Sequence, residues 1–286
     1  MNFSKFAVLN LLFAAMKKTI LILTFAFLCV FSGFSQTTPR NIGTEVIPTA
    51  MFQVTYAAQF TGMDTRASFG FSNTIGGSFI YKTKNNVLFT ANGNLIFGNQ
   101  FNLTRPEILG DAITTTTGEV IGGGGLYTAL AFFQRGYHFQ AEVGKLFSLK
   151  PNPNSGIFIQ AGVGYLSNRI RIEYQIEAMN PPKPLMDDYQ YGYDQKRGGF
   201  ALHGEAGYLL MSESRVINFS VSLEVTYART RHLRAYDFRV FYDEAGEPQI
   251  MGYNDRNQRF NDLYYGIRLS WMIPTYQRQP DAYYYY

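Results

Sequence analysis

The residues that could move protons or hold ions are few in this chain, and six of them stand in segments that alternate polar and apolar positions. His138 lies four positions before Glu142, a spacing that puts both side chains on one face of an extended segment. His203 and Glu205, two positions apart, are related in the same way, and the other two residues are Glu224 and Arg268. Carboxylates, imidazoles and a guanidinium that converge could form ion pairs, relay protons or line an ion path.

Catalytic and cofactor motifs are weak in this sequence. A nucleophilic hydrolase needs a serine and a histidine within hydrogen-bond reach, with a third group that orients the histidine. No serine stands two positions from any of the three histidines, which are His138, His203 and His232. The acids Asp187, Asp188 and Asp194 lack the spacing of a calcium loop and are expected to be solvated. Gly122–Gly125 lacks the following Lys-Ser/Thr of a phosphate-binding loop. We therefore predict no enzyme, no metal site and no cofactor.

Eight segments position these residues, and each alternates apolar and polar side chains with a period of two. In the first segment Phe52, Val54 and Tyr56 fall on one side, whereas Gln53 and Thr55 fall on the other. This period is typical of a strand with two unlike faces. The predicted strands cover about residues 51–60, 67–81, 87–97, 136–147, 157–174, 200–210, 217–227 and 263–273. A change of phase after Ser167 predicts a β-bulge in the fifth strand.

The two faces of these strands differ in bulk, because the apolar faces carry large side chains and the polar faces are small and rich in glycine and serine. A soluble sandwich or a lipocalin-like barrel would turn its apolar faces inward. A narrow barrel in lipid turns them outward and is filled by polar groups from within. The predicted fold is therefore all-β, an eight-stranded antiparallel transmembrane up-and-down β-barrel.

The start of the chain is different in kind. Met16-Lys17-Lys18 precedes an apolar run from Ile20 to Phe31, and small residues follow at Ser32–Ser35. This pattern predicts a signal peptide over 1–35 with its true start at Met16; a transmembrane helix is the alternative, but the apolar run is short for a span. A periplasmic lead-in (36–50), the barrel (51–273) and a periplasmic tail (274–286) follow. Removal of 1–35 takes three lysines and the only cysteine, which lowers the formal net charge from +4 to +1 and argues against nucleic-acid binding.

The connections between strands are alternately short and long, except for a brief first one at Gly62–Arg66. Outer-membrane barrels keep their periplasmic turns short, so we expect long extracellular loops and periplasmic termini. The predicted loops contain a hairpin around Glu244–Pro248, and Leu126–Phe133 is predicted to be either a short helix or an extension of the next strand.

Inside such a barrel, charge must be paired or hydrogen-bonded. We interpret the six ionisable residues as a structural polar plug in which Glu224 and Arg268 pair directly, with a proton relay or an ion path as the alternative. The predicted loops are rich in aromatic residues and arginine, a composition that favours recognition. The candidate extracellular contact residues are Tyr189, Tyr191, Tyr193, Arg234, Tyr236 and Tyr242. Alternatively, these side chains pack the loops onto one another.

The stretches Arg135-Gly136-Tyr137 and Gly162-Val163-Gly164-Tyr165-Leu166, with the strand pattern, resemble uncharacterised outer-membrane barrels of Bacteroidota, which are Gram-negative. More broadly, residues 50–274 resemble small OmpA/OmpX-type barrels, which implies fold and location in the outer membrane. The implied partners are outer-membrane lipid and lipopolysaccharide, with protein partners in a larger complex. The sequence thus favours a non-enzymatic barrel that acts at the cell surface or as an accessory subunit. A small channel or carrier and a lipid-A-modifying enzyme are the alternatives.

Overall fold

The computed structural model describes residues 43–122, 125–149, 151–174, 182–212 and 217–275. The predicted signal peptide over 1–35, its start at Met16 and all of the tail beyond Thr275 lie outside the described residues. The barrel occupies one compact unit, and the first of its strands begins at Thr49.

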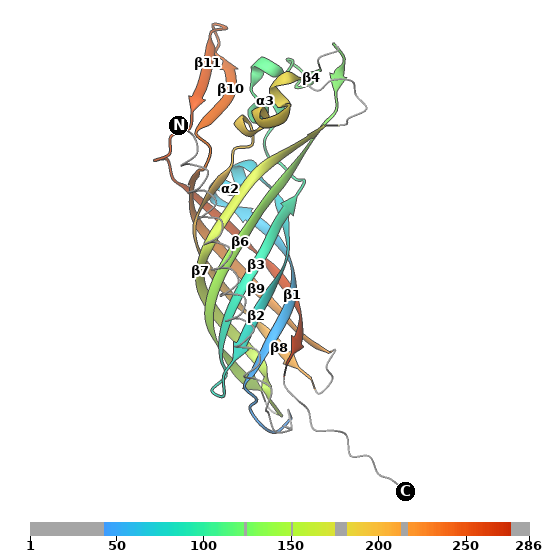
Figure 1. Cartoon of the computed structure of the whole chain (residues 1–286), viewed down its shortest axis with the longest axis vertical. Coiled ribbons are helices and arrows are strands. Elements are labelled where there is room, and N and C mark those ends of the chain that lie inside the picture. Colours follow the sequence, from blue (N-terminus) through green and yellow to red (C-terminus); the bar gives the residue numbers. More distant parts are fainter. Residues whose placement is uncertain (1–42, 123–124, 150, 175–181, 213–216, 276–286) are drawn as a thin grey trace, which may run out of the picture. The chain divides into compact units, whose positions relative to one another are not determined.

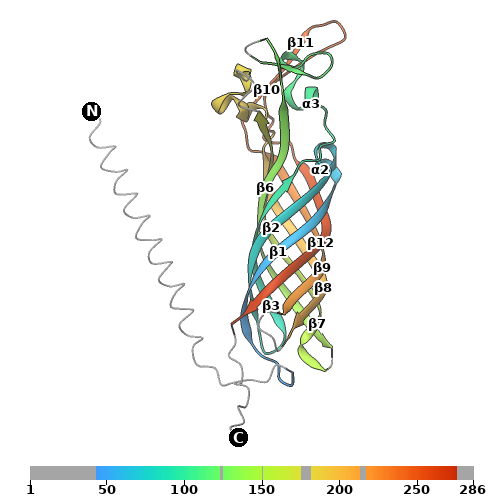
Figure 2. The same cartoon turned by 90° about the vertical axis from the view of Figure 1, so that its right-hand side faces the viewer.

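Eight strands form a closed barrel in which each strand is antiparallel to its neighbours (Figures 1 and 2). They are β1 (Thr49–Gly62), β2 (Phe71–Lys82), β3 (Val87–Gly98), β6 (Leu130–Leu149), β7 (Asn152–Tyr174), β8 (Arg197–Met211), β9 (Asn218–His232) and β12 (Phe260–Pro274). Neighbours in the barrel are neighbours along the chain, and β12 closes the ring on β1. The predicted eight-stranded up-and-down barrel is confirmed.

The outer wall of the barrel is apolar. On β9, Phe219 and Leu223 expose 43% and 66% of their surface, whereas Ser222 and Glu224, which alternate with them, are buried. The other strands repeat this arrangement, which is the reverse of a soluble barrel. Because so large a contiguous apolar surface is unfavourable in water, the wall is built to span a lipid bilayer with its strands. Among the described helices, none is both long and apolar enough to cross a membrane.

The predicted bulge after Ser167 is absent, so that prediction is wrong. β7 pairs with β6 without a shift from Gly156 to Tyr174, and the one irregularity lies between Ser148 and Leu149. Beyond Ser167 it is the environment that changes. Ile170 is buried among apolar side chains of the long connections, while the Arg171 side chain is about half exposed. The apolar face turns inward there because the strand has left the lipid-facing wall.

The long connections gather at one end of the barrel (Figure 1). They contain α3 (Arg105–Leu109), η1 (Asp111–Ile113), β4 (Val120–Ile121), β5 (Tyr127–Thr128), η2 (Lys183–Leu185), η3 (Asp187–Gly192), β10 (Tyr236–Tyr242) and β11 (Pro248–Tyr253), and the short first connection at the same end contains α2 (Met63–Ser68). The predicted hairpin is β10–β11, and the second half of the segment Leu126–Phe133, from Leu130, extends strand β6. The first connection, predicted to be brief at Gly62–Arg66, is brief, and it contains the short helix α2, which the sequence did not predict. The second predicted strand, expected from residue 67, begins at Phe71 for the same reason.

An apolar cluster holds these connections together. Its buried members are Phe69, Ile108, Leu109, Val120, Leu130, Ile170, Ile172, Leu185 and Tyr193. A capping box starts α3, since the backbone N–H of Thr104 donates to Glu107 and lowers the pKa of that carboxyl. The long connections therefore form a packed cap of their own, defined here as the outer cap.

The opposite end of the barrel is closed by Lys82. Its ammonium is fully buried and donates to the backbone oxygen of Ile47 and to the Oδ1 atoms of Asn86 and Asn154, each at 2.9 Å. Asn86 adopts a φ of 57°, which turns the chain tightly between β2 and β3. The segment before β1 is thereby tied across the barrel end.

The apolar wall gives a first prediction. Leu223→Arg places a charge on the lipid face in the middle of β9. We expect it to destabilise the barrel in phospholipid vesicles, lowering its free energy of unfolding by about 2–4 kcal/mol. Ile250→Arg, at a residue 71% exposed on β11, is the control and should change that free energy by less than about 0.5 kcal/mol. Equal effects of both substitutions in a urea titration would contradict a lipid-facing wall.

Candidate functional site

The six ionisable residues predicted for the plug are all buried, with exposed fractions of 2–6%. They come from four strands: His138 and Glu142 from β6, His203 and Glu205 from β8, Glu224 from β9 and Arg268 from β12. Each alternates with lipid-facing apolar residues, so each points into the barrel lumen.

Strand register brings two of these residues together across a glycine. Gly162 of β7 pairs with Glu142 on one side and with His203 on the other. A Cβ at Gly162 would lie 2.6 Å from Cγ of Glu142 and 2.1 Å from the backbone oxygen of Ala141. The missing side chain at Gly162 therefore leaves the space through which Glu142 and His203 approach each other.

Glu224 and Arg268 form the ion pair that their neighbouring strands predict. The Nε and Nη2 atoms of Arg268 both contact Oε2 of Glu224. Gln59 donates from Nε2 to the other oxygen of Glu224, at 2.5 Å. Glu224 is thus paired and hydrogen-bonded on both oxygens, as a carboxylate buried in a lipid-embedded barrel requires.

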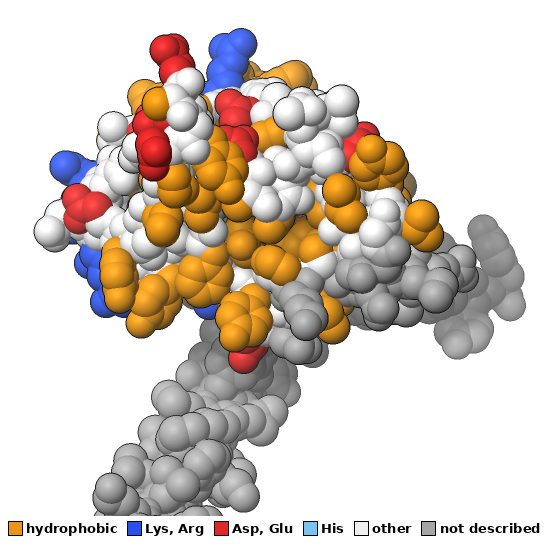
Figure 3. Space-filling view, turned by 90° about the horizontal axis from the view of Figure 1, so that it is seen from above, with side chains coloured by type: hydrophobic (Ala, Val, Ile, Leu, Met, Phe, Trp, Pro, Cys, Tyr) orange, Lys and Arg blue, Asp and Glu red, His pale blue; other side chains and the backbone are white. Residues whose placement is uncertain are grey.

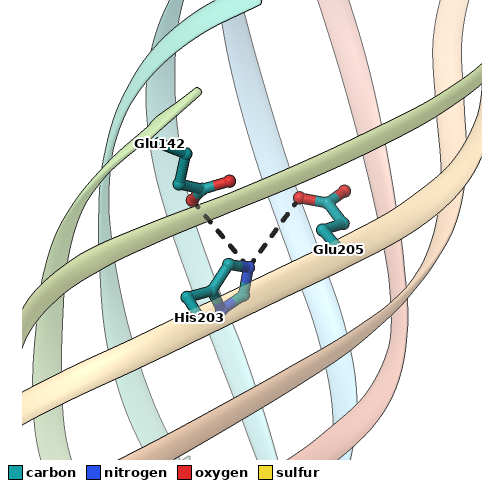
Figure 4. A group of neighbouring side chains, drawn as sticks. All are labelled: Glu142, His203 and Glu205. Atoms are coloured by element: carbon teal, nitrogen blue, oxygen red, sulfur yellow. Dashed lines mark ion pairs between the residues drawn. The ribbon is translucent and has the colours of Figure 1, made fainter. Parts of the chain in front are cut away.

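A second cluster consists of Glu142, His203 and Glu205, whose side chains converge in Figure 4. Nε2 of His203 lies 3.8 Å from Oε1 of Glu142 and 3.9 Å from Oε2 of Glu205, which is too far for hydrogen bonds. Within the described part of the chain, Nε2 of His203 and Oε2 of Glu142 have no hydrogen-bond partner. The cluster therefore has inward-facing polar atoms that its own residues leave unsatisfied.

These three residues could hold a metal ion, because one ligand atom from each lies within 4.8 Å of the others. The sequence prediction of no metal site considered the loop acids and did not consider this cluster. Its ligands are 61 and 2 positions apart, a separation that matches no local metal-binding motif. The signal that could have found it is the pairing of Glu142 and His203 with the same glycine, which needs the strand register.

The lumen on the outer-cap side of this layer is closed by hydrogen bonds. Tyr264 is 1% exposed, and its hydroxyl accepts from Gln134 at 3.1 Å and from Asn168 at 2.8 Å. Asp262, also buried, accepts from Thr65 at 2.8 Å and from Thr230 at 2.6 Å. The lumen therefore contains three successive polar layers, which are formed around Lys82, around Arg268 and around Tyr264 with Asp262.

The predicted extracellular contact residues divide into two groups in the outer cap. Tyr189, Tyr191, Tyr236 and Tyr242 are exposed, as a contact surface requires. Tyr193 is 5% exposed and packs in the apolar cluster, so it is not a contact residue, and its burial raises the pKa of its hydroxyl. Sequence alternation in the tyrosine-rich stretch could not separate the buried ring from the exposed ones.

Arg234, the remaining predicted contact residue, is held by an ion pair. Its Nη2 lies 2.7 Å from Oδ2 of Asp194, and its guanidinium stacks 4.3 Å from the Tyr191 ring centroid. The hydrogen bond with Asp194 raises the pKa of Arg234 above its ordinary value. Asp194 was expected to be solvated, but it is only 4% exposed. It also lies beside Arg169 and accepts a hydrogen bond from the backbone N–H of Lys196. Arg234 therefore orders the outer cap and leaves only part of its side chain to solvent.

No protein-family model and no curated protein sequence matches the chain. Among solved structures it is similar to Neisserial surface protein A, with 10% identity and a TM-score of 0.39 over 78% of this chain and 96% of that one. Ail of Yersinia pestis, in complex with the heparin analogue sucrose octasulfate, gives 8% identity and a TM-score of 0.36 over 79% and 99%. OprG of Pseudomonas aeruginosa is 11% identical, with a TM-score of 0.34 over 82% of this chain and 99% of that one. At these scores the likeness carries no argument, so the barrel assignment rests on the strand register described above.

The ion pair leads to a second prediction. Arg268→Met leaves Glu224 buried without its counter-ion, and we expect a loss of about 3–5 kcal/mol in the free energy of unfolding in detergent. The double variant Arg268→Met/Glu224→Gln should lose less than the sum of the single variants by about 1 kcal/mol or more. Additive losses in the double-mutant cycle would mean that the two side chains do not stabilise each other.

Proposed function

We propose that the protein is a non-enzymatic barrel of a bacterial outer membrane that is exported by its signal peptide and acts through its outer cap. The long connections would lie outside the cell and both termini in the periplasm. The role would be recognition of a protein partner, either on another surface or as an accessory subunit within a larger outer-membrane complex. Short turns at one barrel end and long connections at the other support this orientation.

The filled lumen favours this role over transport. An eight-stranded barrel leaves an interior just wide enough for side chains. Here Lys82, the layer around Arg268 and the hydrogen-bonded Tyr264 occupy it in succession. A small channel would need a continuous water-filled path along the lumen. These side chains occupy that path, so the channel is the weaker candidate.

The observation that carries the proposal is the β10–β11 hairpin, which exposes apolar and aromatic side chains although its base is firmly held. Tyr253 is 77% exposed and Ile250 is 71% exposed. At the base, Arg239 pairs with Asp237 and donates to the backbone oxygen of Glu107 at 3.0 Å. An ordered element that shows aromatic residues to solvent resembles the rigid anchors of protein interfaces.

Part of the aromatic content packs the loops together, as the alternative interpretation of the sequence holds. Phe238 contacts Tyr189 and Tyr193, with ring centroids 6.3 and 6.1 Å apart. Tyr236 and Tyr253 instead lie against each other at 5.2 Å and keep much of their surface exposed. The end-on view in Figure 3 shows hydrophobic side chains interspersed with acids and bases on this face.

A hollow of about 470 Å³ beside the hairpin adds a recess to this face. Its lining includes Asp64, His232, Arg239 and Tyr253, so the recess offers an acidic group, a basic group and an exposed aromatic ring. Within the described residues, Nδ1 of His232 has no hydrogen-bond partner. Such a recess suits one anchoring side chain of a partner.

The third prediction concerns contact at the hairpin. A photo-reactive phenylalanine analogue in place of Tyr253, in the full chain on intact source cells, should give one protein adduct of defined mass after irradiation. A second variant that also carries Tyr236→Ser should lose that adduct at least about tenfold, because aromatic anchors dominate interface energies. The same analogue in place of Tyr265, an aromatic residue on the lipid-facing wall, is the matched control and should give no protein adduct. No adduct at Tyr253, or an equal adduct at Tyr265, would overturn the proposed recognition face.

A further inference from the structure

Inside the barrel, one imidazole nitrogen and one oxygen from each of two carboxylates lie within 4.8 Å of one another, and the three side chains point toward each other (Figure 4). From this geometry we propose that Glu142, His203 and Glu205 bind one divalent first-row transition-metal ion of the zinc type. The proposed role of the ion is structural. The proposal is independent of the recognition role of the outer cap.

Distances within the cluster fit an ion better than direct contact. The separations of 3.8 and 3.9 Å from Nε2 of His203 to the two carboxylates exceed hydrogen-bond length, so an N–H at Nε2 would not be satisfied by either. Ligand bonds of about 2.0–2.1 Å in a tetrahedral site place neighbouring ligand atoms roughly 3.3 Å apart. The two separations from Nε2 of His203 therefore need to close by only about half an ångström, and the two carboxylate oxygens, which lie within 4.8 Å of each other, by at most about 1.5 Å.

The imidazole is already oriented by a hydrogen bond on its other nitrogen. Nδ1 of His203 lies 2.9 Å from the hydroxyl oxygen of Thr226. When Nδ1 carries the proton and donates to Thr226, the lone pair of Nε2 points toward the carboxylates. Metal-bound histidines are held in this way by an outer partner.

The two carboxylates are also held in place by hydrogen bonds from neighbouring side chains. Glu205 accepts from Gln160 at 2.8 Å and from Ser222, and Glu142 accepts from Asn92 at 3.1 Å. These donors are neutral, so they fix the carboxylates without neutralising them. Outer hydrogen bonds of this kind are typical of metal ligands.

The polar layer around Arg268 has more carboxylates than cationic side chains, so a divalent cation would improve its charge balance. It contains three carboxylates, from Glu142, Glu205 and Glu224, and one guanidinium, which pairs with Glu224. Glu142 and Glu205 both lie beside the His203 imidazole, and the single guanidinium of the layer makes its direct ion pair with Glu224 and not with either of them. Uncompensated buried charge is costly, and a divalent cation would neutralise both carboxylates at once.

The donor set selects the class of metal. One imidazole and two carboxylates suit zinc and its first-row neighbours, whereas calcium and magnesium prefer sites made of oxygen alone. The unpartnered Oε2 of Glu142, in a side chain that is fully buried, gives the site a further oxygen for the ion or for a water bound to it. Since side chains close the lumen on both sides, the ion would be taken up as the barrel folds.

The test is metal content after refolding. The full chain is refolded into detergent micelles with ZnCl₂, washed free of unbound metal and analysed for zinc. We expect about one zinc per wild-type chain, and His203→Asn and Glu142→Gln should each lower the zinc content at least tenfold. His232→Asn removes a histidine outside the cluster and should retain the wild-type content. Co²⁺ in place of zinc should give the intense visible bands of a four-coordinate site in the wild-type protein and in His232→Asn, but not in His203→Asn or Glu142→Gln.

A second variant guards against misfolding. Thr226→Val keeps all three ligands and removes only the hydrogen bond to Nδ1, so we expect folded protein with zinc affinity about 10–100 times weaker. Zinc should also raise the unfolding temperature of the wild-type protein and leave that of Glu142→Gln unchanged. Wild-type protein that takes up no zinc, or folded His203→Asn that retains the wild-type content, would overturn the proposal.

Discussion

Compensation of buried charge is the constraint on which this structure depends. The wall of the barrel faces outward with residues such as Leu223 and Phe219, so lipid and not water surrounds the lumen. Charges inside cannot be solvated there and must find partners within the ring. Arg268 and Glu224 pair with each other, and Lys82 donates to three carbonyl oxygens. Asp262 accepts from two hydroxyl groups and lies 3.7 Å from Nη1 of Arg197. The contact of Lys82 on β2 with Asn154 on β7 links strands that are not adjacent in the ring, and together these contacts close the lumen.

The same alternation explains where the structure stops being a membrane wall. On β7 the apolar residues exchange faces beyond Ser167 while the register continues unbroken, so Ile170 enters the outer cap and Arg171 meets water. β7 thus has its apolar face toward lipid in the wall and toward the outer cap beyond it. The extension carries the loops away from the lipid and gives them a core of their own, on which the exposed hairpin is mounted.

Period-two alternation predicted the number of strands, and the difference in bulk between their two faces predicted which face turns outward. Together they predicted that Glu224 pairs with Arg268 inside the barrel. Sequence could not predict the contacts that depend on register. Gly162 lies between Glu142 and His203 only because three strands align there, and no spacing rule within one segment contains that information. The loops were harder still, since burial of Tyr193 and Asp194 follows from packing between connections that are distant in sequence. The helix α2 was missed because its six residues are too few for a periodic signal.

The central claim is that compensated charge closes the lumen and leaves function to the outer cap. Planar-bilayer recording on the refolded full chain tests it most directly, because an open barrel would conduct ions irrespective of any partner. The account predicts no steady current from the wild-type protein across the range of voltages at which the bilayer is stable. Steady currents that are abolished by Glu142→Gln or altered by Arg268→Met would contradict it and would assign the lumen to an ion path.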